Sequence, residues 1–187
     1  MPDSNITKKA LAGAMKELMA QEPFAKISVG DVCQACGMSR KSFYYHFRDK
    51  YDLVNWIFYT EFIESVQQKG FRDSWEFLSN MCRYFYRERD FYRSALQIEG
   101  QNSFRDYFCE VIGPCLDTFT RDLFSDREEH QFYVTFFSAA FLASILRWLM
   151  APAPTEPERY LSQLRSFVVR AARLVLEDLS GEAPAPG

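Results

Sequence analysis

A short run of basic, hydroxyl and aromatic residues at positions 40–46, RKSFYYH, carries side chains suited to nucleic-acid recognition. Arginine and lysine donate hydrogen bonds to phosphates and guanine edges, and serine, tyrosine and histidine also contact the DNA backbone or bases. Ser39 precedes the run as an N-cap, so these residues are expected to form one short helix. The chemistry that they indicate is binding to double-stranded DNA.

A second short helix is predicted just before this one. Ser28 and Asp31 have the spacing of a capping box, and Gly37 stands where a left-handed glycine ends a helix. Two short capped helices with a tight turn are typical of a helix-turn-helix, although a purely structural corner has the same local pattern. The apolar residues expected at the helix crossing are Val32, Ala35, Met38 and Phe43.

The charge distribution favours the DNA-binding interpretation. The whole chain of 187 residues has a net charge of −3, but residues 1–50 carry eight Lys/Arg against five Asp/Glu. The remaining residues are acidic, so a basic N-terminal segment precedes an acidic body. We expect Lys8, Lys9 and Lys16 on the first helix to be solvated.

Other chemistries receive little support from the sequence. Cys33 and Cys36 form a C-x-x-C motif, which we interpret as two small buried apolar residues, with a redox sensor or a zinc site as the alternatives. His46 and His130 are the two histidines, and no nucleotide-binding or hydrolase motif is present. We therefore expect neither an enzyme, nor a metal site, nor a cofactor. Five cysteines at irregular spacing indicate reduced thiols and a cytoplasmic protein.

The apolar periodicity throughout the chain is that of helices, so the predicted fold class is all-α. We expect an N-terminal helix-turn-helix DNA-binding domain over 1–48, an effector-binding and dimerisation domain over 49–180, and a disordered tail over 181–187. Besides the two short helices above, the predicted helices cover about 5–21, 50–69, 73–87, 89–98, 103–123, 127–151 and 157–180, which makes nine in total.

One segment is apolar enough to suggest a membrane span. Residues 132–146, FYVTFFSAAFLASIL, are shorter than the ~20 residues that a bilayer requires. We interpret them as a helix buried on every side and expect no membrane association.

Residues 28–53, SVGDVCQACGMSRKSFYYHFRDKYDL, resemble the DNA-binding domain of the TetR/AcrR transcription regulators. The similarity lies in the G-M-S turn, the F-Y-Y-H-F helix and the D-K-Y-D-L start of the next helix. The longer block FYYHFRDKYDLVNWIF is similar to a subgroup that includes regulators of dihydroxyacetone-kinase operons. Cysteine at positions 33 and 36 departs from the alanine that is usual in the family.

The resemblance implies roles for particular residues. Phe43 and Phe47 would belong to the core of the small domain. The side chains facing the major groove would be Arg40, Lys41, Ser42, Tyr44 and His46. Those holding phosphates would be Ser28, Ser39, Tyr45 and Lys50.

The larger domain of this family usually holds an effector pocket, and aromatic side chains are the candidates to line it. The alternative is core packing, and we expect most of these aromatic residues to be core. The candidates are Trp75, Phe85, Tyr86, Phe104, Tyr107, Phe108, Phe137 and Trp148.

Apolar residues on the last helix form two stripes, of which one has no partner within a single protomer. We expect helices 127–151 and 157–180 to pair with their copies as a four-helix bundle, the alternative being a buried pair in a monomer. The predicted interface residues are Val169, Ala172, Leu176 and Leu179.

These observations predict a homodimeric repressor that binds a palindromic DNA operator and responds to a small-molecule or protein effector that the sequence does not identify. The alternative is a co-regulator with the same fold that is controlled by a protein partner.

Overall fold

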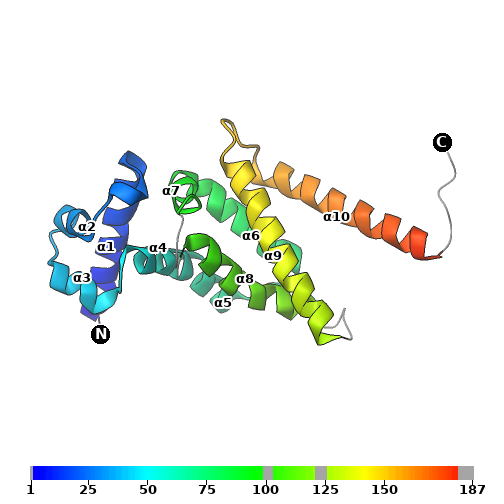
Figure 1. Cartoon of the computed structure of the whole chain (residues 1–187), viewed down its shortest axis with the longest axis horizontal. Coiled ribbons are helices and arrows are strands. Elements are labelled where there is room, and N and C mark those ends of the chain that lie inside the picture. Colours follow the sequence, from blue (N-terminus) through cyan, green and yellow to red (C-terminus); the bar gives the residue numbers. More distant parts are fainter. Residues whose placement is uncertain (1, 99–102, 121–125, 181–187) are drawn as a thin grey trace.

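The computed structural model describes residues 2–98, 103–120 and 126–180, and this part of the chain is entirely helical (Figure 1). Helix α4, a π-helical segment η2 and helix α5 follow one another without a break and form a single rod, so the described part contains the nine helices that the sequence predicts. The elements are α1 (Pro2–Gln21), the 3₁₀ turn η1 (Phe24–Lys26), α2 (Val29–Ala35), α3 (Arg40–His46), α4 (Lys50–Phe58), η2 (Tyr59–Ile63), α5 (Glu64–Lys69), α6 (Ser74–Arg87), α7 (Arg89–Ala95), α8 (Phe104–Thr120), α9 (Arg127–Leu149) and α10 (Pro157–Ser180).

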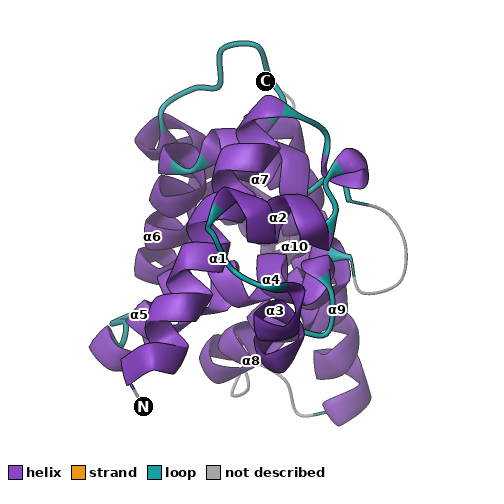
Figure 2. Ribbon diagram, turned by 90° about the vertical axis from the view of Figure 1, so that its left-hand side faces the viewer, coloured by secondary structure: helices purple, strands orange, loops and turns teal. Residues whose placement is uncertain are grey.

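The first three helices pack together at one end of the molecule, where Figure 2 views α2 and α3 against α1. Their shared core contains Leu11 and Met15 from α1, Val32 from α2, and Phe43 and Phe47 around α3. Ala35 is exposed, so its expected place in the helix crossing is wrong. It stands on the outer face of α2, and Cys33 lies in the core in its stead.

Serine side chains cap the starts of these short helices, and a glycine follows the end of α2, as their sequence predicts. Ser28 and Asp31 form a reciprocal capping box, with Ser28 N–H donating to Asp31 Oδ2 at 2.8 Å and Asp31 N–H donating to Ser28 Oγ at 3.2 Å. The Ser39 hydroxyl accepts from Ser42 N–H at 3.1 Å. Gly37 has a φ of +67°, which glycine adopts without the steric cost that other residues meet. The turn between α2 and α3 is therefore held by local bonds.

An aromatic core surrounds Phe58, at the end of α4. Its ring lies within 6.4 Å, centroid to centroid, of six other buried rings. They come from η2, α6, α7 and α8, so the rod that leaves the N-terminal helices also forms the centre of the larger domain. The six rings belong to Phe62, Tyr84, Phe85, Tyr92, Phe104 and Phe108.

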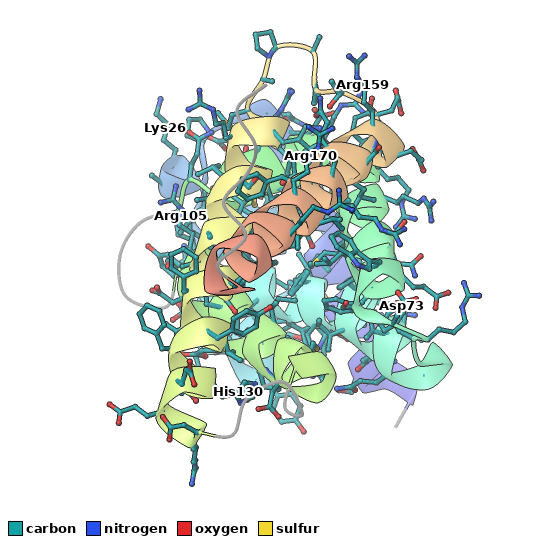
Figure 3. All side chains as sticks on the ribbon, turned by 90° about the vertical axis from the view of Figure 1, so that its right-hand side faces the viewer. Lys26, Asp73, Arg105, His130, Arg159 and Arg170 are labelled. Carbon is teal, nitrogen blue, oxygen red and sulfur yellow. The ribbon has the colours of Figure 1, made fainter. Side chains whose placement is uncertain are left out.

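Helices α9 and α10 form the other end of the molecule. Helix α9 packs along α8, and α10 packs against α6 and lies in front of α9 in Figure 3. The expectation that α9 is buried on every side is wrong, because Phe132 is 72% and Phe136 57% exposed. One protomer covers only one face of this helix.

Among the described helices, α9 alone has the length and composition to cross a bilayer. That alone does not indicate a membrane protein, because core helices of soluble proteins pass the same test. The predicted tail, residues 181–187, lies outside the described part of the chain, and so do the side chains of Ala172, Leu176 and Leu179.

Candidate nucleic-acid interface

The outer face of α3 is formed by exposed basic and aromatic side chains. Lys41 is exposed, Tyr44 is 59% and Tyr45 80% exposed, and Phe43 on the opposite side is fully buried. We call the set Lys41, Tyr44 and Tyr45 the α3 surface. A shallow hollow of about 580 Å³ lies over it, lined by Ser39, Lys41, Ser42, Tyr44 and Tyr45. Large aromatic side chains exposed beside a cation, and carrying hydroxyl groups, suit a partly polar and negatively charged partner.

The other predicted contact residues lie at the edges of this surface. Ser42 and His46 are half-buried on α3, and the His46 ring lies 4.9 Å from the Tyr45 ring, edge to face. Ser28 and Ser39 are exposed at the starts of α2 and α3, where their oxygens already cap the helices. The structure thus brings Lys41, Ser42, Tyr44 and Tyr45 together on one side of α3, whereas the guanidinium of Arg40 lies against α2.

Lys50 has a different environment from the one that the sequence suggests. Its ammonium donates to the carbonyl oxygens of Phe24 and Ile27 at 2.7 Å each, and to that of Ala25 at 3.4 Å. It also lies 4.2 Å over the Phe24 ring. Burial lowers the pKa of Lys50. Because the three donors already have carbonyl partners, this lysine ties the start of α4 to the turn between α1 and α2.

Family comparisons decide what this helical arrangement is. Residues 11–57 match the model of the bacterial regulatory proteins of the tetR family, and residues 73–170 match a transcriptional-regulator C-terminal region. The chain belongs to the TetR family of transcriptional regulators. It is therefore a DNA-binding regulator rather than an enzyme.

Individual relatives agree with this assignment. The chain is 31% identical over 109 residues to DhaS, the HTH-type dhaKLM operon transcriptional activator of Lactococcus lactis subsp. lactis strain IL1403, and the match spans 58% of this chain and 57% of that relative. A solved structure of the dihydroxyacetone kinase operon activator DhaS is similar with a TM-score of 0.68 at 24% identity, covering 90% of this chain and 97% of the other. A TetR regulator from Streptococcus agalactiae 2603V gives a TM-score of 0.63 at 21% identity, with coverages of 89% and 96%.

The two cysteines of the C-x-x-C motif are built into α2 and the turn that follows it. Cys33 is 3% exposed, and burial raises the pKa of its thiol. Cys36 Sγ donates to Val32 O at 3.2 Å. A buried thiol with a raised pKa is poorly reactive, which agrees with the interpretation of Cys33 as a small apolar residue. No group of three or more His, Cys, Asp or Glu that could hold a metal ion occurs among the described residues.

A charged cluster connects the DNA-binding end of this TetR-family regulator with its larger domain. Lys16 on α1 contacts Glu61 on η2 and Glu88, between α6 and α7, each at 2.9 Å, so its expected solvation is wrong. Glu61 also accepts from the Tyr84 hydroxyl at 2.9 Å, and the Tyr84 and Tyr92 oxygens lie 2.7 Å apart in the buried core. We call these five residues the junction network.

The charges of the junction network stabilise one another. Burial disfavours the ammonium of Lys16, but the hydrogen bonds to Glu88 and Glu61 outweigh it and raise the pKa of Lys16. Burial also disfavours the carboxylate of Glu88, but hydrogen bonds from Lys16 and Arg87 outweigh it and lower the pKa of Glu88. Glu61 and Glu88 are 45 and 72 positions from Lys16 in the sequence, so no local motif could have revealed these contacts.

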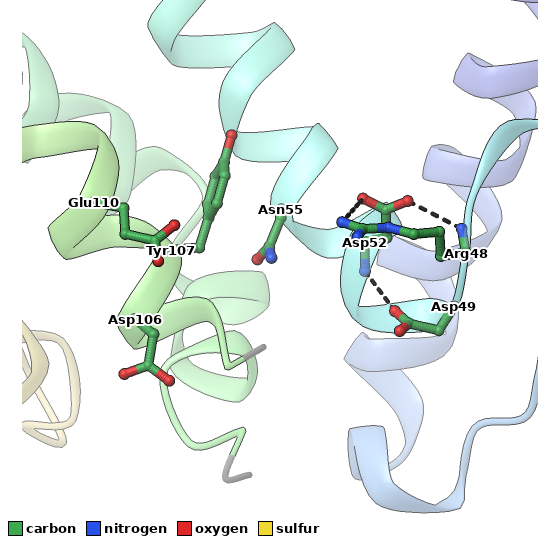
Figure 4. A pocket seen from close by; sticks show the side chains of 7 residues that line it. All are labelled: Arg48, Asp49, Asp52, Asn55, Asp106, Tyr107 and Glu110. Carbon is green, nitrogen blue, oxygen red and sulfur yellow. Dashed lines mark hydrogen bonds and ion pairs between the residues drawn. The ribbon is translucent and has the colours of Figure 1, made fainter. Parts of the chain in front are cut away.

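A polar cavity of about 450 Å³ lies on another side of the same junction, between the start of α4 and α8 (Figure 4). Asp49 and Asp52 act in part as caps, since Asp52 N–H donates to Asp49 Oδ1 at 2.8 Å and Arg48 N–H donates to Asp52 Oδ2 at 3.0 Å. Burial raises the pKa of Tyr107 to about 12, helped by the charges of Asp52 and Glu110. The cavity is lined by Arg48, Asp49, Asp52, Asn55, Asp106, Tyr107 and Glu110.

The eight aromatic residues proposed for an effector pocket fall into separate groups in the described part of the chain. Phe85, Phe104 and Phe108 have at most 1% of their surface exposed and pack around Phe58. Tyr107 lines the cavity of Figure 4.

The remaining four stand on α6 and α9. Trp75 lies under the Arg165 guanidinium, Tyr86 stacks on Trp148, and Phe137 contacts Tyr133 at 4.4 Å. Which of the eight meets an effector stays a prediction.

Proposed function

We propose that this protein binds a near-palindromic DNA operator as a homodimer and releases or engages it in response to an effector. The observation that carries the proposal is the α3 surface, in which a cation and two tyrosines are exposed on the second helix of a capped helix-turn-helix. In such motifs the second helix enters the major groove.

The contact residues divide by where their side chains lie. Lys41, Ser42, Tyr44 and His46 on α3 read base edges in the major groove. Ser28, Ser39 and Tyr45 hold phosphates at the edges of that groove. Lys50 holds in place the turn that precedes Ser28, because its ammonium is bonded to the carbonyls of residues 24, 25 and 27.

The second copy packs against α9 and α10. The exposed positions of α9 include Phe132, Phe136 and Ala143, which recur at the spacing of one helical face. Val169 on α10 is 55% exposed. Exposed apolar faces of this kind mark protein–protein contacts. We place Ala172, Leu176 and Leu179 in the same interface.

The proposed dimer determines the form of the operator. Two-fold symmetry sets two α3 helices on one face of the duplex, about 34–36 Å apart or at a multiple of that spacing. An effector that binds the larger domain changes the separation of the two α3 helices and thereby the affinity for DNA.

Repression is the expected sign of regulation in a cytoplasmic regulator of this kind. Activation is the second candidate, favoured by the 31% identical relative that carries the name of a transcriptional activator. A reporter gene placed behind the selected operator distinguishes them, because deletion of a repressor raises transcription and deletion of an activator lowers it.

The test of DNA binding is selection from a random-sequence pool of duplexes. We expect one enriched near-palindrome, bound by two protomers. Enrichment of no sequence, together with a stable monomer at micromolar concentration in sedimentation, would favour the co-regulator controlled by a protein partner.

A further inference from the structure

Arg40, the first residue of α3, lies against α2 rather than extending from the outer face of α3. A Cβ atom added to Gly30 on α2 would lie 2.5 Å from Arg40 Nη2, and 3.3 Å from both Cζ and Nε. The guanidinium therefore occupies the space that a side chain at position 30 would fill. The pair depends on glycine at position 30, although Gly30 has no unusual backbone conformation.

The surroundings of this guanidinium confirm that it lies beside the first turn of α2. Asp31, the neighbour of Gly30, bonds to Ser28, and those bonds lower the pKa of its carboxyl, with the charge of Arg40 adding to the effect. The Arg40 charge also reaches the thiol of Cys33, on the same helix. Arg40 remains exposed, so its free N–H groups face solvent.

The position of Arg40 indicates which part of the DNA its guanidinium contacts. In a helix-turn-helix the second helix enters the major groove, whereas the first crosses the sugar–phosphate backbone. Lys41, Tyr44 and Tyr45 stand on the outer face of the second helix, and the guanidinium of Arg40 stands beside the first. Arginine suits a phosphate in that position because its planar fork pairs with two phosphate oxygens at once.

We propose that Arg40 binds a backbone phosphate of the operator beside α2, and that Gly30 is the positioning residue that makes room for its guanidinium. This role differs from the base-reading role that the sequence suggests for Arg40. It rests on the proposed DNA binding and assigns different roles to two neighbouring residues: Arg40 contacts a phosphate and Lys41 a base edge.

The experiment compares Arg40→Ala, Gly30→Ala and the double variant in the full-length protein. The probes are the duplex that the wild-type protein selects from a random pool and a scrambled duplex of the same length, each titrated over a series of salt concentrations. We expect Arg40→Ala to weaken both duplexes by the same factor and to reduce the slope of log K against log salt by about 1. Gly30→Ala should shift this slope in the same direction. The double variant should bind each duplex no more weakly than Arg40→Ala does.

Three controls accompany the experiment, and the first two separate this proposal from a loss of folding. Gly13→Ala changes a glycine on α1 that has no neighbouring atom within 4 Å of the added Cβ, so DNA binding should not change. Gly30→Ala should not lower the melting temperature, because alanine favours a helix over glycine and the displaced Arg40 side chain is flexible. Arg40→Lys, which keeps the charge, should retain the wild-type salt slope.

Three results would overturn the proposal. Weaker binding of Arg40→Ala to the selected duplex alone would assign Arg40 to base reading. An unchanged salt slope in Gly30→Ala would show that Gly30 does not position the guanidinium. If the wild-type protein bound neither duplex, the proposed function itself would fail, and this inference with it.

Discussion

The α3 surface and the outer face of α9 both expose large aromatic residues, but their chemistry differs. On α3 the exposed rings are Tyr44 and Tyr45, which carry hydroxyl groups and lie beside Lys41. On α9 the exposed rings are Phe132 and Phe136, which have no polar group. The difference teaches that exposure alone does not identify a partner, because the first face suits a hydrated polyanion and the second an apolar protein surface.

Salt concentration should produce the largest difference between the two faces, because it should weaken DNA binding far more than dimerisation. If each operator complex neutralises about 6–10 phosphates, its affinity should fall about 10³–10⁵-fold between about 50 and 200 mM salt. The apolar interface between protomers should change little over the same range. Filter binding and sedimentation at matched salt concentrations test the contrast, and a flat salt response of operator binding would contradict it.

A charge on the apolar face should break the dimer and, through it, DNA binding. Phe136→Glu puts an unpaired carboxylate into the proposed interface, which should cost at least about 3 kcal/mol, or roughly 100-fold in operator affinity. Sedimentation should show a monomer even though α3 is untouched. Gln131→Arg, an exposed position on another side of α9, is the matched control. If Phe136→Glu remained dimeric, this face would not be the interface.

Removing the cation of the α3 surface should relax sequence preference. Lys41→Ala should lower discrimination between the selected and the scrambled duplex by about 1–3 kcal/mol, because a lysine that contacts a base edge is lost. Competition titrations measure the ratio of the affinities for the two duplexes directly. Arg159→Ala, which removes one exposed positive charge at the α10 end (Figure 3), should keep that ratio. Equal effects of both variants would show that Lys41 supplies only charge.

The junction network should affect the stability of the fold rather than DNA binding. Lys16→Met leaves Glu61 and Glu88 without their shared cation and should reduce the free energy of unfolding by about 1–3 kcal/mol near neutral pH. Lys9→Met, on an exposed position of the same helix, is the control and should be near neutral. Urea denaturation of both variants provides the comparison.

The same network predicts a pH dependence. Because the pKa of Glu88 is lowered from 4.5 in the folded protein, its stabilisation is present above that value and is lost as pH falls through the folded pKa. The pKa of Lys16 is raised, so its contribution is lost only as pH rises above 10.5. The stability difference between wild type and Lys16→Met should therefore narrow below about pH 4.5. A difference that stayed constant down to pH 3 would show that the carboxylates are not involved.

Features that depend on neighbouring residues could be predicted from the sequence. The caps at Ser28 and Ser39 and the turn at Gly37 follow from local spacing, and the apolar period of residues 50–69 indicates a continuous helix. Core positions such as Phe43 follow from the same pattern. These signals locate the helix-turn-helix and its outer face.

Features that depend on distant residues could not be predicted. Lys16 has the appearance of an ordinary surface lysine until Glu61 and Glu88 are brought to it. Lys50 and Arg40 have basic side chains that the sequence assigns to DNA. The carbonyls of residues 24, 25 and 27 hold the charge of Lys50, and the space left by the missing side chain of Gly30 holds that of Arg40. Which group a long basic side chain contacts therefore depends on the tertiary fold and not on its neighbours in the sequence.

The π-helical segment η2 determines how the two halves of the rod, α4 and α5, are rotated relative to each other. A π turn contains one residue more than an α turn, and each residue of an α-helix advances the chain by about 100°. If Tyr59–Ile63 formed regular α-helical turns instead, both halves of the rod would stay helical, but α5 would be rotated relative to α4 by roughly that angle. Phe62, Ile63 and Val66, now buried, would leave the core, and Glu61 would no longer face Lys16. The wider π turn of this segment therefore fixes the rotational phase between the DNA-binding end and the rest of the protein.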